Sequence, residues 1–484
     1  MTFRRRSTKI VATLGPASNS PDAITRLLQA GVDVFRLNAS HGSSEDRRAL
    51  ISVIRSTAAA LDTRPGILLD LQGPKIRLGK FDGGQAYLKE GSHFAITIHP
   101  VTGTADLAST TYQHLALDVH PGDRILLADG SLELRVLKTD GECVVSEVVC
   151  GGIVSDRKGI NLPGVKLSTP SMTEKDIADL EFGIAHQVDF LALSFVRTGD
   201  DVAQLRELLK SHDAKLPIIA KIEKPEAMDN LDAILRLSNG VMVARGDLGV
   251  ETTLEKVPTM QKSIIEKARL QGRYVITATQ MLESMIDHPV PTRAEVSDVA
   301  NAIYDGTDAV MLSAETASGK YPVEAVRRMA SIALEVESVV GKKGFPAPAF
   351  TADYSGHPEI IAGAAYNAAC SAGVAAIVVF TASGFSARLI AGYRPPIPIY
   401  AFTPSQTTMR ALSVVYGVRP ILSPDAESAD EMLNVVDHTL LPPGWLQPGQ
   451  SIVVVAGQPV GRAGTTNLIK LYTLGGNASG ALAP

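Results

Sequence analysis

Cysteine is scarce in this sequence, and long apolar runs are missing. Among 484 residues there are three cysteines, Cys143, Cys150 and Cys370, and they form no CxxC pair. The ten histidines form no HExxH motif. These absences argue against a disulfide framework and against a zinc site. No stretch of eighteen consecutive apolar residues occurs, so we predict no membrane-spanning helix.

An excess of one charge is missing too. Lys plus Arg number 46 and Asp plus Glu number 51, which gives a net charge of −5 without a long run of one sign. This balance argues against nucleic acid as the main partner. The N-terminal segment MTFRRRSTKIVATLGP is basic, but its apolar part is too short for a signal peptide. We therefore predict a cytoplasmic protein with no membrane partner.

Apolar side chains are plentiful. Hydrophobic residues make up 45% of the chain and charged residues 20%, a composition typical of globular proteins with large cores. The chain is too long for a single core, so we expect two or three domains.

Eight short apolar runs, each followed sooner or later by a segment of helical period, dominate residues 1–71 and 169–340. The runs are KIVATLG, VDVFRLNA, GILLDL, VDFLALSF, PIIAKIE, GVMVARGDL, YVITATQM and DAVMLSAET. Eight β/α repeats over nearly 250 residues predict an α/β fold of the TIM (β/α)8 barrel type. The third repeat is the exception, because residues 72–168 separate GILLDL from its helix.

These intervening residues contain turn signals such as DGGQ and HPGD between short alternating segments such as RILLADG, LELRVLK and CVVSEVV. The pattern predicts an inserted all-β domain, a small β-barrel. Because it leaves and re-enters at the C-terminal end of the third strand, we expect it to form a lid over the barrel mouth.

A Gly/Pro-rich segment, GKKGFPAPAF, separates the barrel from a further set of apolar runs, VAAIVVFTA, PIPIYAFTP, VRPILSP and SIVVVAG. These runs alternate with helical segments and predict an open α/β sheet. The predicted division is therefore a catalytic barrel (residues 1–71 and 169–343), a lid (72–168) and a C-terminal α/β regulatory domain (344–484).

The fifth run, LPIIAKIEKP, carries Lys221 and Glu223 at its C-terminal end, on the same face of a strand. Alone, they can be read as an ion pair that satisfies only itself. The active site of a TIM barrel lies where the strands end, however, and other runs also end in polar residues. These are Arg36, Asn38, Ser40 and His41 after the second run, Asp70 after the third, Arg245, Gly246 and Asp247 after the sixth, Thr277 and Thr279 in the seventh, and Ser313 and Glu315 in the eighth.

Two of these carboxylates suggest a metal. Glu223 and Asp247, with no histidine or thiolate near them in sequence, favour Mg²⁺ or Mn²⁺. Arg36 and Lys221 add positive charge for an anionic substrate, and the backbone N–H groups of Gly246 and Asp247 can meet a carboxylate or phosphate. Spacing alone leaves two reaction classes open, phosphoryl transfer and formation of a pyruvate-type enolate by an aldolase or lyase.

Whole motifs add a family resemblance. RLNASHG, DLQGPKIR, KGINLPG, KIEKPEAMDNLDAI, VARGDLGVE, ATQMLESM and VMLSAETASGKYP, followed by FTASGFSARLIAGYRP and GTTNLIKL, extend over essentially the whole chain. Together they resemble the pyruvate kinases. The resemblance implies transfer of a phosphoryl group from phosphoenolpyruvate to ADP, which gives pyruvate and ATP in the last step of glycolysis, with Mg²⁺ as cofactor and a homotetramer as the assembly.

The resemblance also implies roles for individual residues. Lys221 matches the group that stabilises the moving phosphoryl and the enolate oxygen, and Thr279 and Ser313 are candidates for the proton relay to the enolate. The remaining positions are Glu223 and Asp247 for the metal, Arg36 for the phosphate, Gly246, Asp247 and Thr279 for the substrate carboxylate, and Asn38, His41, Arg77 and Lys158 near the nucleotide.

Two positions depart from the common family pattern. Many members have Glu where this chain has Lys75, and they require K⁺. The positions that match their K⁺ site are Asn38, Ser40, Asp70 and the carbonyl of Leu71. The ammonium group of Lys75 can replace that ion, so we expect K⁺ to be dispensable, although Lys75 can also be read as a solvated charge at the lid hinge. In LLADG of the lid, Ala128 stands where an acidic residue is usual, which bears on lid closure around ADP.

The segment TASGFSAR follows a predicted strand and opens a predicted helix. Thr381, Ser383, Gly384 and Ser386 there can form a phosphate cradle, or simply an ordinary helix start. The family uses this loop for phosphorylated effectors, so we expect allosteric activation by a sugar phosphate or nucleotide monophosphate. Two other functions stay open: a metal-dependent aldolase or lyase, against which Arg77 and Lys158 argue, and a non-catalytic metabolite sensor.

Overall fold

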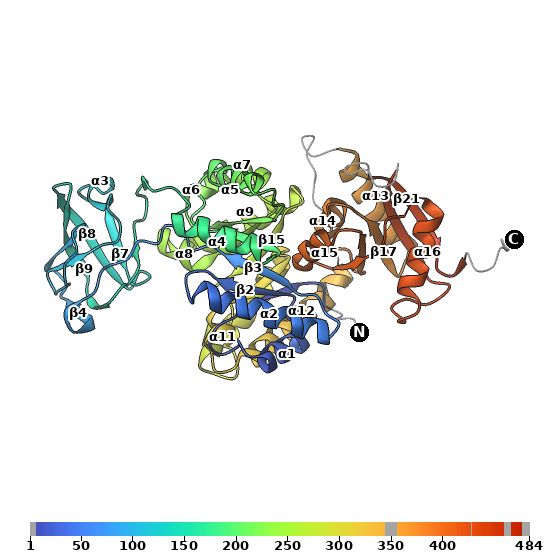
Figure 1. The fold of residues 1–484 in the computed structure, drawn as a ribbon, viewed down its shortest axis with the longest axis horizontal. Coiled ribbons are helices and arrows are strands. Elements are labelled where there is room, and N and C mark those ends of the chain that lie inside the picture. Colours follow the sequence, from blue (N-terminus) through green and yellow to red (C-terminus); the bar gives the residue numbers. More distant parts are fainter. Residues whose placement is uncertain (1–5, 344–355, 427, 459–465, 477–484) are drawn as a thin grey trace.

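The computed structural model describes residues 6–343, 356–426, 428–458 and 466–476. Most of the predicted linker at residues 341–350, and the first two residues of the GTTNLIKL motif, lie outside these ranges. Within them, no helix is both long enough and apolar enough to cross a bilayer. The molecule is elongated, with the inserted domain at one end, the barrel in the middle and the C-terminal domain at the other end (Figure 1).

Eight parallel strands close into a barrel in the order β1-β16-β15-β14-β13-β12-β3-β2, which confirms the predicted TIM fold. The strands are β1 (Lys9–Thr13), β2 (Val34–Asn38), β3 (Gly66–Asp70), β12 (Phe190–Leu193), β13 (Ile218–Ile222), β14 (Gly240–Ala244), β15 (Tyr274–Ala278) and β16 (Ala309–Leu312). Each coincides with one of the eight apolar runs. Most of their residues are buried, as expected for strands covered on both faces.

Helices surround the barrel (Figure 1). They are α1 (Pro21–Ala30), α2 (Ser44–Ala60), α4 (Glu174–Ala185), α5 (Gly199–Ser211), α6 (Glu226–Asp229), α7 (Leu231–Leu237), α8 (Arg245–Glu251), α9 (Val257–Leu270), α10 (Arg293–Asp305), α11 (Ala314–Ala317) and α12 (Pro322–Lys343). Their starts follow local chemistry. Capping boxes begin α2, α4 and α10, where Ser43, Thr173 and Thr292 pair with an acidic residue three positions on.

The inserted domain is built mainly of β-strands, as predicted, and contains one short helix. Its six-stranded sheet has the order β11-β7-β8-β9-β5-β6, and a two-stranded sheet pairs β10 with β4. The elements are β4 (Gln85–Leu88), β5 (His93–Thr97), β6 (Leu107–Ser109), α3 (Leu115–Asp118), β7 (Arg124–Leu127), β8 (Leu132–Thr139), β9 (Cys143–Cys150), β10 (Gly152–Ser155) and β11 (Ile160–Asn161). This domain is called the lid below.

The C-terminal domain is an open five-stranded sheet of order β19-β18-β17-β20-β21. Its elements are α13 (His357–Ala372), β17 (Ala376–Phe380), α14 (Phe385–Gly392), β18 (Ile399–Thr403), α15 (Gln406–Ala411), β19 (Val418–Leu422), α16 (Ala429–Leu440), β20 (Ser451–Gly457) and β21 (Thr466–Thr473). The first four strands were predicted. The edge strand β21, antiparallel to β20, was not.

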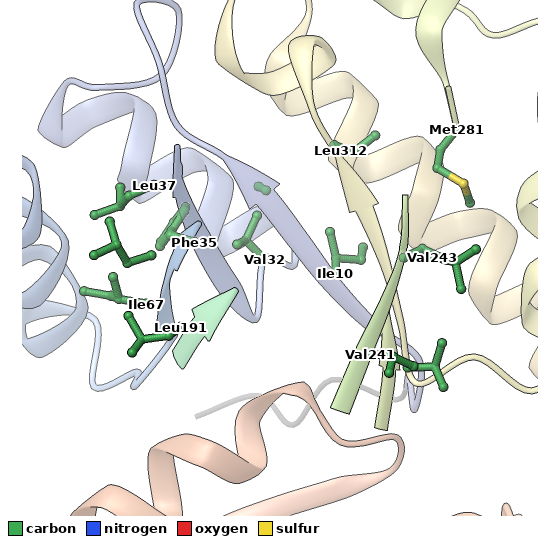
Figure 2. Packing of buried hydrophobic residues seen from close by; sticks show 14 of the residues in the cluster. Ile10, Val32, Phe35, Leu37, Ile67, Leu191, Val241, Val243, Met281 and Leu312 are labelled. Carbon is green, nitrogen blue, oxygen red and sulfur yellow. The ribbon is translucent and has the colours of Figure 1, made fainter. Parts of the chain in front are cut away.

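Three apolar clusters account for most of the core. One lies between the barrel strands and their helices and includes Phe35, Leu191 and Met281 (Figure 2). A second contains barrel residues such as Val11 and continues into the C-terminal domain. The third lies wholly within the lid.

Candidate active site

Lys221 lies at the C-terminal end of β13, within a group of acidic side chains. Its ammonium Nζ is 2.8 Å from Glu223 Oε1, 3.3 Å from Asp70 Oδ1 and 2.8 Å from Ser194 Oγ. Burial alone would lower the pKa of Lys221, but the carboxylates of Asp70, Glu223 and Asp247 raise it above its ordinary value. Lys221 is therefore a permanent cation at the mouth of the barrel.

Glu223 is buried beside a second carboxylate. Its Oε2 accepts a hydrogen bond from the N–H of Phe195 at 2.8 Å. Burial raises the pKa of Glu223, Lys221 opposes this change, and the negative charge of Asp247 adds to it. Two carboxylates that repel each other in this way fit a divalent cation.

The rest of the donor set also agrees with a hard divalent ion. Among the described residues, no group of three or more His, Cys, Asp or Glu side chains forms an all-protein metal cage. Mg²⁺ does not need one, because it is usually held by one or two carboxylates together with water and substrate phosphate. Glu223 and Asp247 provide two carboxylates of the kind that such a site uses.

Arg36, in β2, is fixed by its neighbours. Its Nε donates to Asp70 Oδ2 at 2.7 Å, and its Nη1 donates to the hydroxyl of Thr13 at 3.1 Å. Burial would raise the pKa of Asp70, but Lys221 and Arg36 lower it below its usual value. Asp70 is thus an anion that orients two cations toward the same end of the barrel.

Thr279 follows β15 in a left-handed backbone conformation, with φ of 69°, which is unusual for a β-branched residue. Its hydroxyl accepts the N–H of Gly246 at 2.7 Å and donates to the carbonyl of Ala278 at 2.6 Å. Arg245 Nη2 donates to the Thr279 carbonyl at 2.8 Å. The N–H of Gly246, predicted to meet a substrate carboxylate, is therefore already donated within the protein.

Ser313 follows β16 and is held by Glu315. The carboxylate of Glu315 accepts the N–H of Ser313 at 2.6 Å and the N–H of Leu282 at 3.1 Å. Burial raises the pKa of Glu315, and these N–H bonds oppose that change. Glu315 therefore connects the loop after β15 to the end of β16.

The residues predicted near the nucleotide come from both the barrel and the lid: Asn38 and His41 from the barrel, Arg77 and Lys158 from the lid. Burial lowers the pKa of His41, and the charges of Lys75, Arg77 and Arg36 lower it further, which places these cations within electrostatic reach of the imidazole. Lys158 is next to Arg77 on the paired lid segment, because its carbonyl accepts the N–H of Leu78 at 2.9 Å.

The predicted K⁺ positions are engaged in protein contacts. Asn38 Oδ1 accepts the N–H of Ser40 at 3.0 Å, and the carbonyl of Leu71 accepts the hydroxyl of Ser194 at 2.7 Å. Asp70 is engaged by Arg36 and Lys221. Lys75 is exposed at the start of the lid.

Several site residues were missed from the sequence. Ser194 and Phe195, at the end of VDFLALSF, contact Lys221 and Glu223, and the rule applied to the other strand ends would have found them. A lid-to-barrel contact was missed as well. Asn161 Nδ2 of β11 donates to Glu251 Oε1 at 3.0 Å, and Glu251 Oε2 is 2.8 Å from Lys224 Nζ.

A small cleft of ≈ 20 Å³ lies beside this contact, and residues of both parts line it, among them Lys75, Asp129, Asn161, Asp247 and Glu251. Ala128, in the turn next to Asp129, has a positive φ of 51°. The lid turn and the end of β14 therefore border the same space.

The predicted effector loop precedes α14. Gly384, in left-handed conformation, caps the helix, and its N–H donates to the hydroxyl of Thr381 at 2.9 Å. The hydroxyl of Ser386 is buried and pairs with Thr466 at 2.5 Å. In the predicted phosphate cradle, the Gly384 N–H is therefore already used by Thr381, whereas Ser383 is exposed.

Comparisons with known proteins agree in sequence and in fold. The family model described as pyruvate kinase, barrel domain, matches residues 5–326, and the one described as pyruvate kinase, alpha/beta domain, matches residues 359–472. The chain is 46% identical over 473 residues to a pyruvate kinase of Geobacillus stearothermophilus and 47% identical over 473 residues to one of Bacillus licheniformis. Each alignment covers 97% of this chain and 81% of the relative. The crystal structure of a pyruvate kinase from Cryptosporidium parvum matches with a TM-score of 0.88 at 35% identity and covers 97% of this chain and 96% of that one.

Proposed function

The chain belongs to the pyruvate kinase family of glycolytic phosphotransferases, and from that premise we propose which of its residues transfer the phosphoryl group of phosphoenolpyruvate to ADP. One observation carries the proposal. The buried ammonium of Lys221 is held within reach of Asp70, Glu223 and Asp247, where the barrel strands end. A fixed cation of this kind suits a reaction in which negative charge moves from one oxygen to another.

Lys221 stabilises the transferring phosphoryl group and the enolate oxygen that it leaves. Arg36 binds the phosphate, since Asp70 and Thr13 hold its guanidinium in one orientation. The transfer passes through a loose, metaphosphate-like state, so positioning and positive charge matter more than covalent participation by the protein.

Glu223 and Asp247 hold the divalent cation, Mg²⁺ or Mn²⁺. The ion supplies Lewis-acid stabilisation of the phosphoryl and enolate oxygens when it is bound. Asp247 also borders the cleft shared with the lid, which supports a metal site between the two proposed substrate sites.

The enolate then gains a proton on carbon. The hydroxyl of Thr279 is the first candidate for a relay, and Ser313, held by Glu315, is the second member. Their hydroxyls need a water or another group as the acid, because a hydroxyl alone has no useful pKa. Thr279, Gly246 and Asp247 also bind the substrate carboxylate, and the Thr279 hydroxyl donates to it in place of the Ala278 carbonyl, while it still accepts the N–H of Gly246.

ADP enters between the lid and the barrel. Asn38, His41 and Arg77 lie on the barrel side and at the start of the lid, and Lys158 lies on the lid. An aldolase or a lyase needs no such set of cations beside its substrate site.

Lys221→Met tests the central assignment. We expect turnover to fall by roughly 10²- to 10³-fold or more with little change in KM for phosphoenolpyruvate, because the lost contact acts mainly on developing charge. The measurement is pyruvate formation in a coupled assay with and without ADP, together with a thermal unfolding curve. Lys320→Met, which removes an exposed lysine paired with Asp287, is the matched control.

Unchanged turnover in a folded Lys221→Met would remove Lys221 from the mechanism. Pyruvate formed by the wild type without ADP would favour an aldolase or lyase. Binding of phosphoenolpyruvate without any turnover would favour a metabolite sensor.

Lys75 supports activity without K⁺. Its charge acts in the region of His41 and Arg77, and the oxygens that would bind K⁺ are engaged by Ser40, Ser194, Arg36 and Lys221. With Mg²⁺ in tetramethylammonium buffer, the wild type keeps near-full activity, while Lys75→Glu requires added K⁺. Lys80→Glu, an exposed lid lysine, is the control. A large loss in the wild type that K⁺ restores would show that Lys75 does not replace the ion.

A phosphorylated effector activates the enzyme at the start of α14. Exposed Ser383 and the first turn of that helix supply the cradle, while Thr381 and Ser386 shape it from within. Sugar phosphates and nucleotide monophosphates are titrated at sub-saturating phosphoenolpyruvate, with Ser383→Glu as the blocked variant. A lack of response to every phosphate would overturn this assignment.

The proposal also retains the division into residues 1–71 with 169–343, 72–168 and 344–484, a cytoplasmic location suited to glycolysis, and a homotetramer. Light scattering of the full chain on a sizing column measures the assembly directly.

A further inference from the structure

A small cavity lies where the C-terminal domain meets the N-terminal face of the barrel, at the end remote from Lys221. The volume open to the centre of a water-sized group is ≈ 10 Å³. The cavity therefore has room for about one such group. The turns before β15 and β16 line one side, and α14 with the residues after it lines the other. The charged and hydroxyl-bearing lining residues are Arg269, Arg273, Tyr274, Asp308, Arg388 and Arg394.

Positive charge in this cavity exceeds negative charge. In the described part of the chain, four arginines and one carboxylate, that of Asp308, line it. Asp308 is already engaged, because its Oδ1 accepts Arg394 Nη1 at 2.9 Å and the N–H of Tyr416 at 3.1 Å, and its Oδ2 accepts the N–H of Val275 at 2.9 Å. This carboxylate is therefore taken up by Arg394 and two backbone N–H groups, and no ion pair joins it to Arg388 in the described part of the chain.

Two of these arginines have a lowered pKa, mainly because they are buried. Burial, followed by the charge of Arg394, lowers the pKa of Arg269 to about 10. Burial also lowers the pKa of Arg388 to about 10, although Tyr274 opposes the change. A negative charge in the cavity would favour the cationic form of both residues.

Two buried donors point to the same kind of ligand. Tyr274 is 3% exposed, and among the described residues its hydroxyl has no hydrogen-bond partner. The same holds for Nε of Arg388, whose Nη1 donates to the carbonyl of Ser383 at 3.2 Å. A buried polar group without a partner is costly, and both of these atoms can donate. Their complement is an acceptor, and the surrounding charge makes it an anion.

We propose that this cavity is a binding site for a small inorganic anion, in which the Tyr274 hydroxyl and the Arg388 guanidinium are the principal donors. Arg269 and Arg273 contribute charge. The space fits a halide ion best, and a single oxyanion such as sulfate or phosphate shares the same chemistry if the arginine side chains spread. The bound anion neutralises positive charge where α14 meets the barrel. It therefore stabilises the interface between the C-terminal domain and the barrel.

The test uses the thermal unfolding of the full chain at constant ionic strength, with gluconate replaced stepwise by bromide, chloride, sulfate or phosphate. Binding to a single site on the folded state raises the unfolding midpoint, and the stabilisation grows as RT ln(1 + c/Kd), where c is the anion concentration, which gives the Kd by fitting. Tyr274→Phe removes one oxygen atom only, and Arg388→Met removes the charge. We expect each variant to raise the fitted Kd for halide by at least about tenfold, because a hydrogen bond to an ion is lost.

Arg327→Met, which removes an exposed arginine on α12, is the control and should keep the wild-type curve. Crystals soaked in bromide should show the ion beside the Tyr274 hydroxyl. Identical halide curves for the wild type, Tyr274→Phe and Arg388→Met would overturn the proposal and indicate a general electrolyte effect. A sulfate or phosphate response that survives in Tyr274→Phe would place that oxyanion elsewhere, and a response to halide alone would identify the ligand class as halide.

Discussion

The lid and the C-terminal domain flank the same barrel (Figure 1) but are attached to it in opposite ways. The lid has an apolar core of its own, with Phe94, Leu134 and Val148 among its members, and that core includes no barrel residue. The C-terminal domain shares one apolar cluster with the barrel, in which Val11 and Leu389 both take part. A part that keeps its core to itself can move as a unit, because its motion exposes little apolar surface.

Polar contacts follow the same division. Asn161 joins the lid to Glu251 through one neutral donor at 3.0 Å. Contacts with charged groups lie at the two ends of the lid segment, where Arg197 donates to the Leu167 carbonyl and the N–H of Gly73 donates to Asp176. The C-terminal domain is joined through buried charges, since Lys9 Nζ donates to the carbonyl of Val418 at 2.8 Å and Arg394 pairs with Asp308 at 2.9 Å. The lid interface is thus suited to opening and closing with each substrate. The C-terminal interface is suited to staying formed and to transmitting small displacements between the domains.

Breaking the buried ion pair between the barrel and the C-terminal domain has the largest expected effect on stability. Asp308→Ala leaves the buried charge of Arg394 without its partner and removes the acceptor of the Val275 and Tyr416 N–H groups, so the free energy of unfolding falls by about 3–5 kcal/mol. Urea unfolding followed by circular dichroism measures it. Asp287→Ala, at an exposed ion pair with Lys320, should change little. Equal stability in both variants would mean that the C-terminal domain does not depend on this pair.

Breaking the lid contact has a smaller and more local effect. Asn161→Ala removes a hydrogen bond worth about 1 kcal/mol, which should raise KM for ADP by up to about fivefold and leave the urea midpoint of the barrel unchanged. Ser92→Ala, which removes a hydrogen bond within a lid turn, controls for damage to the lid itself. A global loss of stability in Asn161→Ala would contradict the independence of the lid.

The smallest effect concerns the pH dependence of the lid. Ser168 donates to Asp118 through its hydroxyl at 2.6 Å and its N–H at 2.9 Å. These bonds hold the last residue of the lid segment against the end of α3. Burial would raise the pKa of Asp118, but the hydrogen bonds from Ser168 and Tyr112 lower it below its ordinary value. This contribution to stability is present above the ordinary Asp pKa and is lost as the pH falls through the lowered value.

Hydrogen exchange of lid amides should therefore speed up on acidification below about pH 4, once corrected for intrinsic exchange. In Asp118→Asn, the lid should be looser at neutral pH and should lose this acid-dependent component. An acid response of the same size in the variant would assign the effect to another group.

The barrel was predictable because each of its strands is buried on both faces and therefore reads as a short apolar run. The grouping of Lys221, Glu223 and Asp247 at the mouth of the barrel was predictable because the C-terminal ends of the barrel strands meet there. Strand β21 was not recognised because its exposure is mixed along its length, as is common at a sheet edge. The use of the Gly384 N–H by Thr381, and of Ser386 by Thr466 from a distant segment, depends on side-chain geometry that local sequence does not encode.

Thr279 has a consequence for engineering. A left-handed backbone is easier for Gly or Asn than for a β-branched residue, so a screen for thermal stability alone would favour replacing Thr279. The same replacement would remove the hydroxyl that holds Gly246 beside the substrate site. Selection for heat resistance and selection for turnover therefore pull this one position in opposite directions, and it should be kept fixed in any library meant to yield a more durable catalyst.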